Sequence, residues 1–421
     1  MGQDRSSGAD KPRAFALRNR RFLQRSRLQG SNAQLSSFAT LADKTSPVRV
    51  VLIGAGLMGK KWLSVLMASP DVELVGLVDL NLAGAEAALR EAGIDNVLCG
   101  TNLTEVGNAT GAQAVVNATV PVAHHPTNVE ALLAGLPVLC EKPVAPTVSQ
   151  ALSLAAAAEV SGQLLMISQS RRYYRNLAEL KDKLVSLGDV GTVTTEFFKA
   201  PHFGGFREEM EHVLLVDMAI HAFDVARYLL DQEPVSVYCE EYNPSWSWYA
   251  GDAATTAIFE FSGGVRYIYS GSWCSPGLET SWNGSWRISG ARGTARWDGE
   301  NRADFEIADD DTGEASLPQR ADHDGAEEIA GSLAEFVSAL RTGIVPSGEV
   351  HANVLSLAMV EAAVLSAQRR ERVSMEHVLG TAYAAAVNNE ALPEVRATLL
   401  AWPSVEQVLM AESRIGAAPS A

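Results

Sequence analysis

The feature that most constrains this chain is a glycine-rich turn, Gly54-Ala55-Gly56-Leu57-Met58-Gly59, set between an apolar run and a helical pattern. Residues 48–53 predict a buried parallel strand, and residues 58–69 predict a helix that ends before Pro70. In such a turn the first glycine makes the bend, the second lets a pyrophosphate approach the backbone, and the third allows close helix packing. We therefore expect a dinucleotide on Gly54, Gly56, Leu57, Met58 and Gly59.

An acidic residue follows at a suitable distance. The apolar run 72–78 ends at Asp79, 20 residues after Gly59. A carboxylate there accepts hydrogen bonds from ribose hydroxyls and repels a 2′-phosphate. Because no Arg or Lys follows in residues 80–83, the pattern favours NAD over NADP. The alternative is a structural strand–turn–helix with an incidental aspartate, which the coincidence of strand, turn, helix and acid disfavours.

The rest of the chain shows two different patterns of apolar and polar residues. Up to about residue 168, short apolar runs alternate with helical stretches, which predicts a doubly wound parallel sheet. Beyond it, alternating segments with glycine punctuation at 262–264 and 289–293 are typical of hairpins in a mostly antiparallel sheet. The expected fold class is therefore α/β: an N-terminal Rossmann domain followed by an α+β domain with a large, mostly antiparallel sheet.

Element and domain limits follow from the same patterns. Further strands are expected near 97–99, 114–119, 137–140 and 164–167, and helices near 83–92, 126–134, 148–160, 178–187, 326–342 and 350–369. Four segments are expected: a disordered basic leader (1–46), an NAD-binding Rossmann domain (47–168), a substrate-binding and oligomerisation domain (169–380), and a C-terminal extension (381–421) that the pattern leaves unplaced.

Composition excludes several classes of function. The net charge of −16 argues against nucleic-acid and anionic-membrane partners. No uninterrupted apolar run reaches the roughly 18 residues of a membrane span, and the four cysteines form no CxxC pair, so no zinc site is expected. Arg20-Arg21 resembles part of an export signal, but the apolar stretch that such signals need does not follow, so we expect a cytoplasmic location.

Two further motifs carry ionisable residues. Glu141-Lys142-Pro143 follows a predicted strand, at the sheet edge where open α/β folds bind ligands. Asp217 and His221 are four residues apart, so a helix places them on one face, among apolar neighbours. From these residues alone the pair could be a surface ion pair, a satisfied core histidine, or half of a metal site with His124 or His125.

Together, the glycine turn, Asp79, Glu141-Lys142-Pro143 and Asp217-x-x-x-His221 resemble the glucose–fructose oxidoreductase/inositol dehydrogenase (Gfo/Idh/MocA) family over about residues 48–375. The resemblance implies that Lys142, Asp217 and His221 form the catalytic group and also contact substrate. It implies further site residues as follows: Thr119, His124, Glu141 and Lys142 at the cofactor, and Arg172 and Tyr173 at the substrate. A homodimer or homotetramer built through the sheet is also implied.

The chemistry of these residue types fits the implied roles. Oxidation of a secondary alcohol removes the hydroxyl proton as hydride leaves the carbon. A neutral His221 suits the base role, and an ammonium at Lys142 stabilises alkoxide character on the oxygen. Asp217 would orient His221 or bind a neighbouring hydroxyl. No metal is required for this chemistry.

The implied function is hydride transfer between NAD and a secondary alcohol of a sugar, inositol or related polyol. Two alternatives stay open: tightly bound NAD used for redox-assisted glycoside cleavage or epimerisation, and a non-catalytic dinucleotide-sensing regulator, which the intact catalytic set disfavours. Departures from the family pattern at 119–121 and 168–170 leave the substrate open. Six of eight tryptophans fall between Trp246 and Trp297, where they could stack on sugar rings or simply pack in sheet faces and interfaces.

Overall fold

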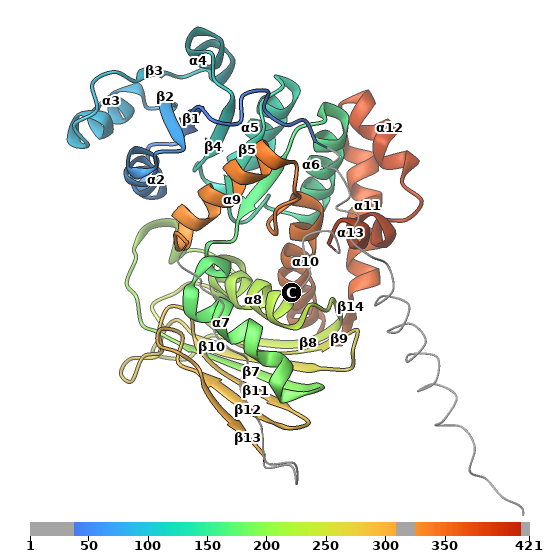
Figure 1. Ribbon diagram of the computed structural model, residues 1–421. Coiled ribbons are helices and arrows are strands. Elements are labelled where there is room, and N and C mark those ends of the chain that lie inside the picture. Colours follow the sequence, from blue (N-terminus) through green and yellow to red (C-terminus); the bar gives the residue numbers. More distant parts are fainter. Residues whose placement is uncertain (1–37, 309–324, 414–421) are drawn as a thin grey trace, which may run out of the picture. The chain divides into compact units, whose positions relative to one another are not determined.

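The computed structural model describes residues 38–308 and 325–413, which belong to one compact unit (Figure 1). Most of the expected basic leader, residues 1–37, and the last eight residues of the expected extension lie outside the described residues. The two sheets that the sequence predicts are both present, one wholly parallel and one mostly antiparallel.

Sheet A is the parallel sheet, with strand order β3-β2-β1-β4-β5-β6. Its strands are β1 (Val48–Ile53), β2 (Val72–Val78), β3 (Leu98–Gly100), β4 (Ala114–Asn117), β5 (Val138–Glu141) and β6 (Leu165–Ser168). This is the doubly wound order, in which ligands bind beyond the carboxyl ends of the strands where the order reverses, between β1 and β4. The predicted Rossmann fold is thereby confirmed.

Helices cover both faces of sheet A. They are α2 (Leu57–Ala68), α3 (Leu82–Glu91), α4 (Leu103–Thr110), α5 (Pro121–Leu133) and α6 (Val148–Ser161). Because strand side chains alternate, Val50 and Leu52 pack with α2 and α3, whereas Val51 and Ile53 pack with α4, α5 and α6. The prediction missed α4, which is only eight residues long, and began α5 at Pro126 although that proline lies inside the helix.

Sheet B is the mostly antiparallel sheet, with order β13-β12-β11-β7-β10-β9-β8-β14. Its strands are β7 (Val190–Phe198), β8 (Pro234–Tyr242), β9 (Ala254–Phe261), β10 (Arg266–Ser272), β11 (Ser285–Gly290), β12 (Gly293–Trp297), β13 (Asp304–Ile307) and β14 (Val373–Ser374). Only β7 and β10 pair in parallel. The hairpins expected at 262–264 and 289–293 join β9 to β10 and β11 to β12.

One face of sheet B is covered by α8 (Ile220–Leu230), and α7 (Arg175–Lys183) precedes the sheet in the chain. Phe223 of α8 makes edge-to-face ring contacts with Phe259 and Tyr269, at centroid distances of 4.8 and 5.4 Å. Such contacts fix the helix on the sheet because aromatic edges and faces carry opposite partial charges. The helix that bears His221 is therefore held by the core of sheet B.

The C-terminal helices return to the Rossmann half. They are α9 (Glu328–Thr342), α10 (Val350–Arg369), α11 (Met375–Asn389), α12 (Pro393–Ala401) and α13 (Val405–Ser413). Figure 1 shows α10 between sheet B and α6; it contacts both, while α11 and α12 also contact α6 and α9 packs against β6. The expected boundaries at 169 and 381 therefore do not mark separate packing units, because these helices bury apolar side chains against the Rossmann half.

Helix α10 has 20 residues, and an 18-residue window of it has a mean hydropathy of 1.5, so it is long and apolar enough to cross a membrane. It is the one such helix among the residues that the structure describes, and 72% of its apolar window is buried inside the fold. Its apolar surface is thus used in packing within the fold.

Residues 38–46 differ from the expectation of a disordered leader. Phe38 is buried in the cluster on one face of sheet A. The backbone N–H of Ala39 donates to the carbonyl of Gly162 at 2.8 Å, and that of Leu41 donates to Leu340 at 2.9 Å. A basic, serine-rich composition does not reveal a single anchoring phenylalanine, so the boundary at residue 46 was set too late.

Candidate active site

The glycine turn has the geometry of a dinucleotide cradle. Gly54 has φ of 96°, in the left-handed region that favours glycine, and a Cβ there would lie 2.7 Å from the carbonyl oxygen of Ala118. A Cβ at Gly59 would collide with the carbonyl oxygen of Gly54. A Cβ at Gly56 would meet nothing within 4 Å, so the outer side of the turn is open. Glycine is thus required for a different reason at each of the three positions: conformation at Gly54, open space for a ligand at Gly56, and close packing at Gly59.

The amino end of α2 supplies donors at this turn. Gly56 caps the helix without a side-chain hydrogen bond, and the first turn holds no acidic residue. The first intrahelical bond runs from Lys60 N to Gly56 O at 2.9 Å, so the N–H groups of Leu57, Met58 and Gly59 have no helical acceptor. Free N–H groups and the positive end of the helix dipole suit a pyrophosphate. The residues present therefore fit a dinucleotide.

Asp79 stands at the carboxyl end of β2 and braces the turn. Its Oδ2 accepts from the N–H of Ala55 at 2.7 Å, and its Oδ1 accepts from the N–H of Asn81 at 2.7 Å. Each carboxylate oxygen can accept a second hydrogen bond, which leaves acceptor capacity for ribose hydroxyls. The sequence predicted the position of this acid but not its bond to the turn.

Lys142 and Asp217 meet across the two halves of the chain. The Nζ of Lys142 donates to the carbonyl oxygen of Asp217 at 2.9 Å and lies 3.5 Å from Oδ1. Arg207 donates from Nε to Oδ2 at 2.7 Å. Burial raises the pKa of Asp217, but Lys142 and Arg207 lower it by more, so the net pKa lies below its usual value. The carboxylate is therefore ionised.

Asp217 lies in a π-helical turn, Leu214–Ala219, that runs directly into α8. Such turns are rare in proteins overall but are often found at functional sites. Their wider ring of backbone atoms displaces the side chains that follow. His221 comes one residue into α8, and its Nδ1 is buried without a hydrogen-bond partner among the described residues. Burial, together with the charges of Arg171 and Lys142, holds the pKa of His221 well below its usual value. The imidazole is therefore neutral.

Glu141 and His124 hold neighbouring parts of the chain in place. Glu141 is buried and accepts from Trp62 Nε1 at 2.9 Å, and burial raises its pKa. The ring nitrogens of His124 contact two carbonyl oxygens, that of Pro143 at 2.6 Å and that of Thr119 at 3.1 Å. Pro143 follows the cis peptide Lys142–Pro143, and Thr119 follows strand β4, so His124 bridges these two segments. His124 is fully buried, so it holds backbone in place.

The metal alternative receives no support from these contacts. His125 Nε2 is 2.9 Å from Ser153 Oγ, on the side of α5 that faces α6. Among residues 38–308 and 325–413, no three His, Cys, Asp or Glu side chains are grouped so that they could hold a metal ion. The hydroxyl of Thr119 donates to Asn117 Oδ1 at 2.7 Å, and its oxygen can still accept a hydrogen bond, so its contact with the cofactor stays a prediction.

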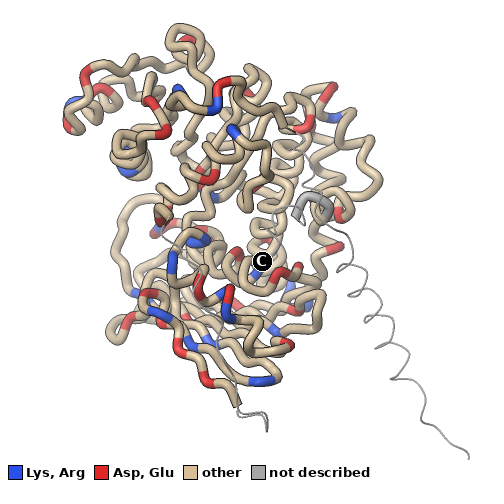
Figure 2. The backbone as a smooth tube through the Cα atoms, in the orientation of Figure 1, with Lys and Arg blue, Asp and Glu red and all other residues tan. Residues whose placement is uncertain are grey.

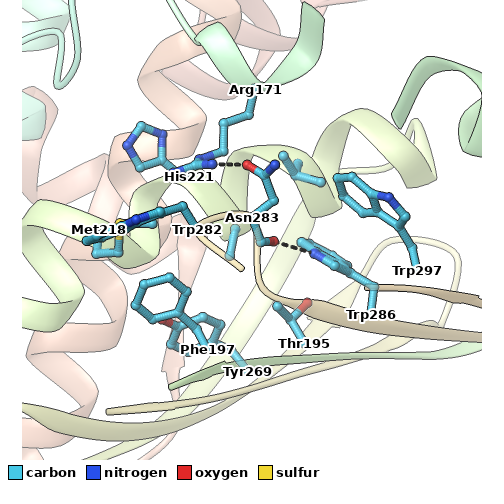
Figure 3. Close-up of a pocket in the computed structure, with 12 residues that line it drawn as sticks. Arg171, Thr195, Phe197, Met218, His221, Tyr269, Trp282, Asn283, Trp286 and Trp297 are labelled. Atoms are coloured by element: carbon cyan, nitrogen blue, oxygen red, sulfur yellow. Dashed lines mark hydrogen bonds between the residues drawn. The ribbon is translucent and has the colours of Figure 1, made fainter. Parts of the chain in front are cut away.

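The adjacent residues Arg171 and Arg172 have different roles: Arg172 makes a structural ion pair, and Arg171 lines the pocket. Arg172 donates from Nε and Nη2 to the two carboxylate oxygens of Asp224, both at 2.7 Å, and Tyr173 donates to Glu335. Arg171 instead lines the pocket with His221 and donates to Asn283 (Figure 3). Consecutive residues of a 3₁₀ turn point about 120° apart, so only one arginine faces the pocket. The contacts of Arg172 and Tyr173 speak against the expected substrate role.

The pocket beside His221 has aromatic walls. Phe197, Trp282, Trp286 and Trp297 line it, as Figure 3 shows, with Tyr269 and Met218. Its polar lining residues are few (Arg171, Thr195, His221 and Asn283), which is common in small-molecule sites that fix orientation with a handful of contacts. Sequence reasoning missed Arg171, Asn283 and Arg207; the first lay beside the residue chosen, and the other two have no motif around them.

Charge on the described part of the chain is mixed. In Figure 2, Lys and Arg are interspersed with Asp and Glu along the tube. Many form ion pairs, such as Arg49–Glu73 at 3.1 Å and Lys60–Glu91 at 2.6 Å. This distribution gives no support to a nucleic-acid footprint, which gathers positive charge on one face.

Comparison with known proteins decides the family. Residues 48–169 match the model of the oxidoreductase family with an NAD-binding Rossmann fold, and residues 183–296 match the GFO/IDH/MocA C-terminal domain. The chain belongs to the Gfo/Idh/MocA family. It is therefore an oxidoreductase that binds a nicotinamide dinucleotide, as the sequence predicted.

Relatives agree with this assignment at modest identity. Inositol 2-dehydrogenase 4 of Saccharopolyspora erythraea is 34% identical over 45% of this chain and 56% of its own length. An uncharacterised Sinorhizobium fredii protein, y4oX, is 27% identical over 59% of this chain and 72% of its length. The chain thus spans little more than half of the named dehydrogenase.

Solved structures show the same fold. An oxidoreductase from Agrobacterium radiobacter in complex with NAD⁺, L-tartaric acid and magnesium has a TM-score of 0.68 at 20% identity, covering 79% of this chain and 99% of that one. A putative myo-inositol dehydrogenase from Sinorhizobium meliloti has a TM-score of 0.63 at 22% identity, covering 78% and 99%.

Proposed function

We propose that this chain is an NAD-dependent dehydrogenase that transfers hydride between the nicotinamide and a secondary alcohol of a sugar, inositol or related polyol. One observation carries the proposal: Lys142, at the carboxyl edge of sheet A, reaches the turn that bears Asp217 and leads to His221. Lys142 and Asp217, which are 75 residues apart in the chain, are in contact, and the charge of Lys142 also lowers the pKa of His221, which supports a common role for the three residues.

Each residue has a distinct task. The ammonium of Lys142 stabilises negative charge on the reacting oxygen, and the neutral imidazole of His221 accepts the hydroxyl proton. Asp217, held ionised by Lys142 and Arg207, orients the lysine and accepts a bond from a neighbouring hydroxyl. The bound dinucleotide supplies the hydride acceptor. The low pKa of His221 keeps the imidazole free to take a proton over most of the neutral range.

NAD is the proposed cofactor rather than NADP. Asp79 is the acid that a ribose hydroxyl would meet, and residues 80–83 offer no cation to a 2′-phosphate. The complexes of similar solved proteins contain NAD⁺ or NADH. A panel of polyols offered with each cofactor separately would test this preference.

The proposed setting is a cytoplasmic homodimer or homotetramer assembled through the open face of sheet B. Tyr238, Ile258 and Ile268 form one row across β8, β9 and β10 and are only half-buried. A continuous apolar row on an uncovered sheet face is typical of a subunit interface.

The test is NADH formation with myo-inositol, D-glucose, D-xylose and D-glucuronate. We expect at least one to reduce NAD, with NADP used less well, and His221→Gln to lose most of the rate. Exchange of substrate hydrogens with solvent without NADH release would favour the alternative in which the cofactor stays bound. Absence of both turnover and dinucleotide binding would refute the proposal that the chain is a dehydrogenase.

A further inference from the structure

Three loops gather at one end of sheet B, next to the proposed active site. Because β7, β8 and β10 point the same way, the loops that leave them, 199–213, 243–253 and 273–284, lie together (Figure 1). The first of these loops leads into the turn that carries Asp217. These loops therefore extend the surface on which a substrate at His221 would lie.

Four large aromatic side chains of these loops are exposed. They are Phe203 (44% exposed), Phe206 (60%), Trp246 (66%) and Trp282 (44%), which we call the aromatic rim. The rings of Phe203 and Trp282 lie 6.4 Å apart, and Trp246 Nε1 donates to the carbonyl of Cys274 at 2.8 Å. Large aromatics that are exposed together, rather than singly, mark a binding surface.

The aromatic rim is continuous with the catalytic residues. Trp282 lines the pocket with Arg171 and His221. The guanidinium of Arg207 lies 5.3 Å from the ring of Phe203 and 4.9 Å from that of Phe206, while its Nε holds Asp217. A molecule that places one ring at His221 and is longer than one ring would reach the aromatic rim.

The loops are tied to one another. Tyr249 donates from its hydroxyl to the carbonyl of Pro201 at 2.7 Å, Ala250 N donates to Glu208 O at 2.8 Å, and Asp252 N donates to Glu211 O at 2.8 Å. The aromatic side chains are thus carried on a hydrogen-bonded frame, and less conformational freedom is lost when a ligand binds.

The charges around the aromatic rim indicate which ring it takes. The one lysine and the one arginine of these loops are both paired: Lys199 with Glu279 at 2.8 Å, and Arg207 with Asp217 at 2.7 Å. His212, whose pKa is raised, is paired with Glu241 at 2.6 Å. Glu209 and Glu211 are exposed beside them. Unpaired cations recognise phosphates, so a nucleotide-linked sugar is disfavoured, whereas carboxylates accept bonds from hydroxyl groups.

We propose that the aromatic rim is a second sugar subsite, so that the substrate is a glycoside whose reacting ring lies at His221 and whose second pyranose ring stacks on Phe203, Phe206 and Trp246. The apolar C–H face of a pyranose matches an aromatic face, and its hydroxyls meet the flanking carboxylates. This inference rests on the proposed function for the reacting ring, but binding at the aromatic rim is measurable without turnover.

The test titrates the full chain, saturated with NADH, with maltose, cellobiose and lactose against glucose and galactose, by calorimetry. We expect one disaccharide to bind at least tenfold more tightly than its component monosaccharides. Phe206→Ala and Trp246→Ala should each reduce that ratio at least fivefold. Leu400→Ala, an equally exposed apolar residue on α12, is the control and should leave the ratio unchanged.

Several results would overturn the subsite. These are equal affinity for one and two rings, no binding by any of the disaccharides, tighter rim-dependent binding of UDP-glucose than of a disaccharide, or variants that change the oligomeric state rather than the affinity. Failure of the proposed function looks different: no polyol or glycoside reduces NAD, while disaccharide binding still depends on Phe206 and Trp246.

Discussion

The Nζ of Lys142 donates to the main-chain carbonyl of Asp217 at 2.9 Å and lies 3.5 Å from its carboxylate. This pair joins the end of a Rossmann strand to a turn of the second sheet's helix layer. Because the lysine contacts both the backbone and the side chain of Asp217, its ammonium is held in a defined position rather than rotating freely. A fixed charge stabilises a developing alkoxide better than a mobile one does.

Replacing this lysine should separate catalysis from cofactor binding. We expect Lys142→Met to reduce kcat/KM by at least about 100-fold, since positioned proton-transfer and charge-stabilising groups contribute about 10²–10⁴. Dinucleotide affinity, measured by NADH fluorescence, should change far less than kcat/KM, although the family resemblance also places Lys142 at the cofactor. Lys44→Met, at an exposed lysine, is the matched control. A Lys142 variant as active as the control would remove the lysine from the mechanism.

The acid limb of the pH–rate profile should report His221. Burial and the charges of Arg171 and Lys142 lower its pKa well below the usual value. As the pH is lowered, kcat/KM should therefore stay constant past pH 6.5 and fall only at more acidic pH. Arg171→Gln removes one positive charge, which raises the pKa of His221 and should move the acid limb to higher pH. An unmoved limb would show that another group titrates.

Gly56 and Gly59 of the turn should respond differently to alanine. At Gly59 a Cβ meets the carbonyl of Gly54, so Gly59→Ala should destabilise the fold by about 1–3 kcal/mol, as overpacking does. At Gly56 there is open space, so Gly56→Ala should change the free energy of unfolding by less than about 1 kcal/mol. It should nevertheless weaken NADH binding at least tenfold. Equal NADH affinity in Gly56→Ala and wild type would contradict the cradle.

A buried histidine away from the site should make stability depend on pH. His351 contacts Glu349 at 2.8 Å and Glu159 at 2.9 Å. Burial lowers its pKa, but these carboxylates outweigh burial and raise the pKa to about 10. Because the folded value exceeds the unfolded value of about 6.5, the stabilisation is complete below pH 6.5 and is lost as pH rises through about 10.

Thermal unfolding between pH 6 and 10 checks this contribution. His351→Gln should flatten the fall of Tm over that range, because glutamine keeps a hydrogen bond but no titrating charge. His377→Gln, at an exposed histidine on α11, should keep the wild-type slope. Parallel curves for His351→Gln and wild type would mean that the histidine is neutral when buried.

Local pattern predicted most of the fold because the strands of sheet A are buried runs between clear breaks. The course of β1 and β2 follows from residues 48–53 and 72–78 alone. The placement of residues 375–413 did not follow, because an Ala-rich helix gives no sign of which helix it packs against. In the structure α11 and α12 pack against α6, and α13 packs against α10 and α11. Short α4 fell below the length at which helical periodicity is distinguishable.

The candidate site divides in the same way. Residues within motifs, such as Lys142 and Asp217, were named because their spacing has a chemical reason. Arg171 and Arg172 are adjacent, and which of them faces the pocket depends on the 3₁₀ turn and on the partner Asp224, which lies 52 residues away from Arg172. Contacts that depend on tertiary partners leave no mark in a local pattern.

Transfer of deuterium from carbon to cofactor tests the central claim most directly. The chain would be incubated with NAD and either perdeuterated myo-inositol or perdeuterated D-glucose, and the reduced cofactor analysed by mass spectrometry. The account predicts that whichever of the two reduces NAD gives a reduced cofactor one mass unit heavier, formed at least about 100-fold more slowly by Lys142→Met. Reduced cofactor without the label, or labelled cofactor formed equally fast by Lys142→Met, would contradict hydride transfer at this site.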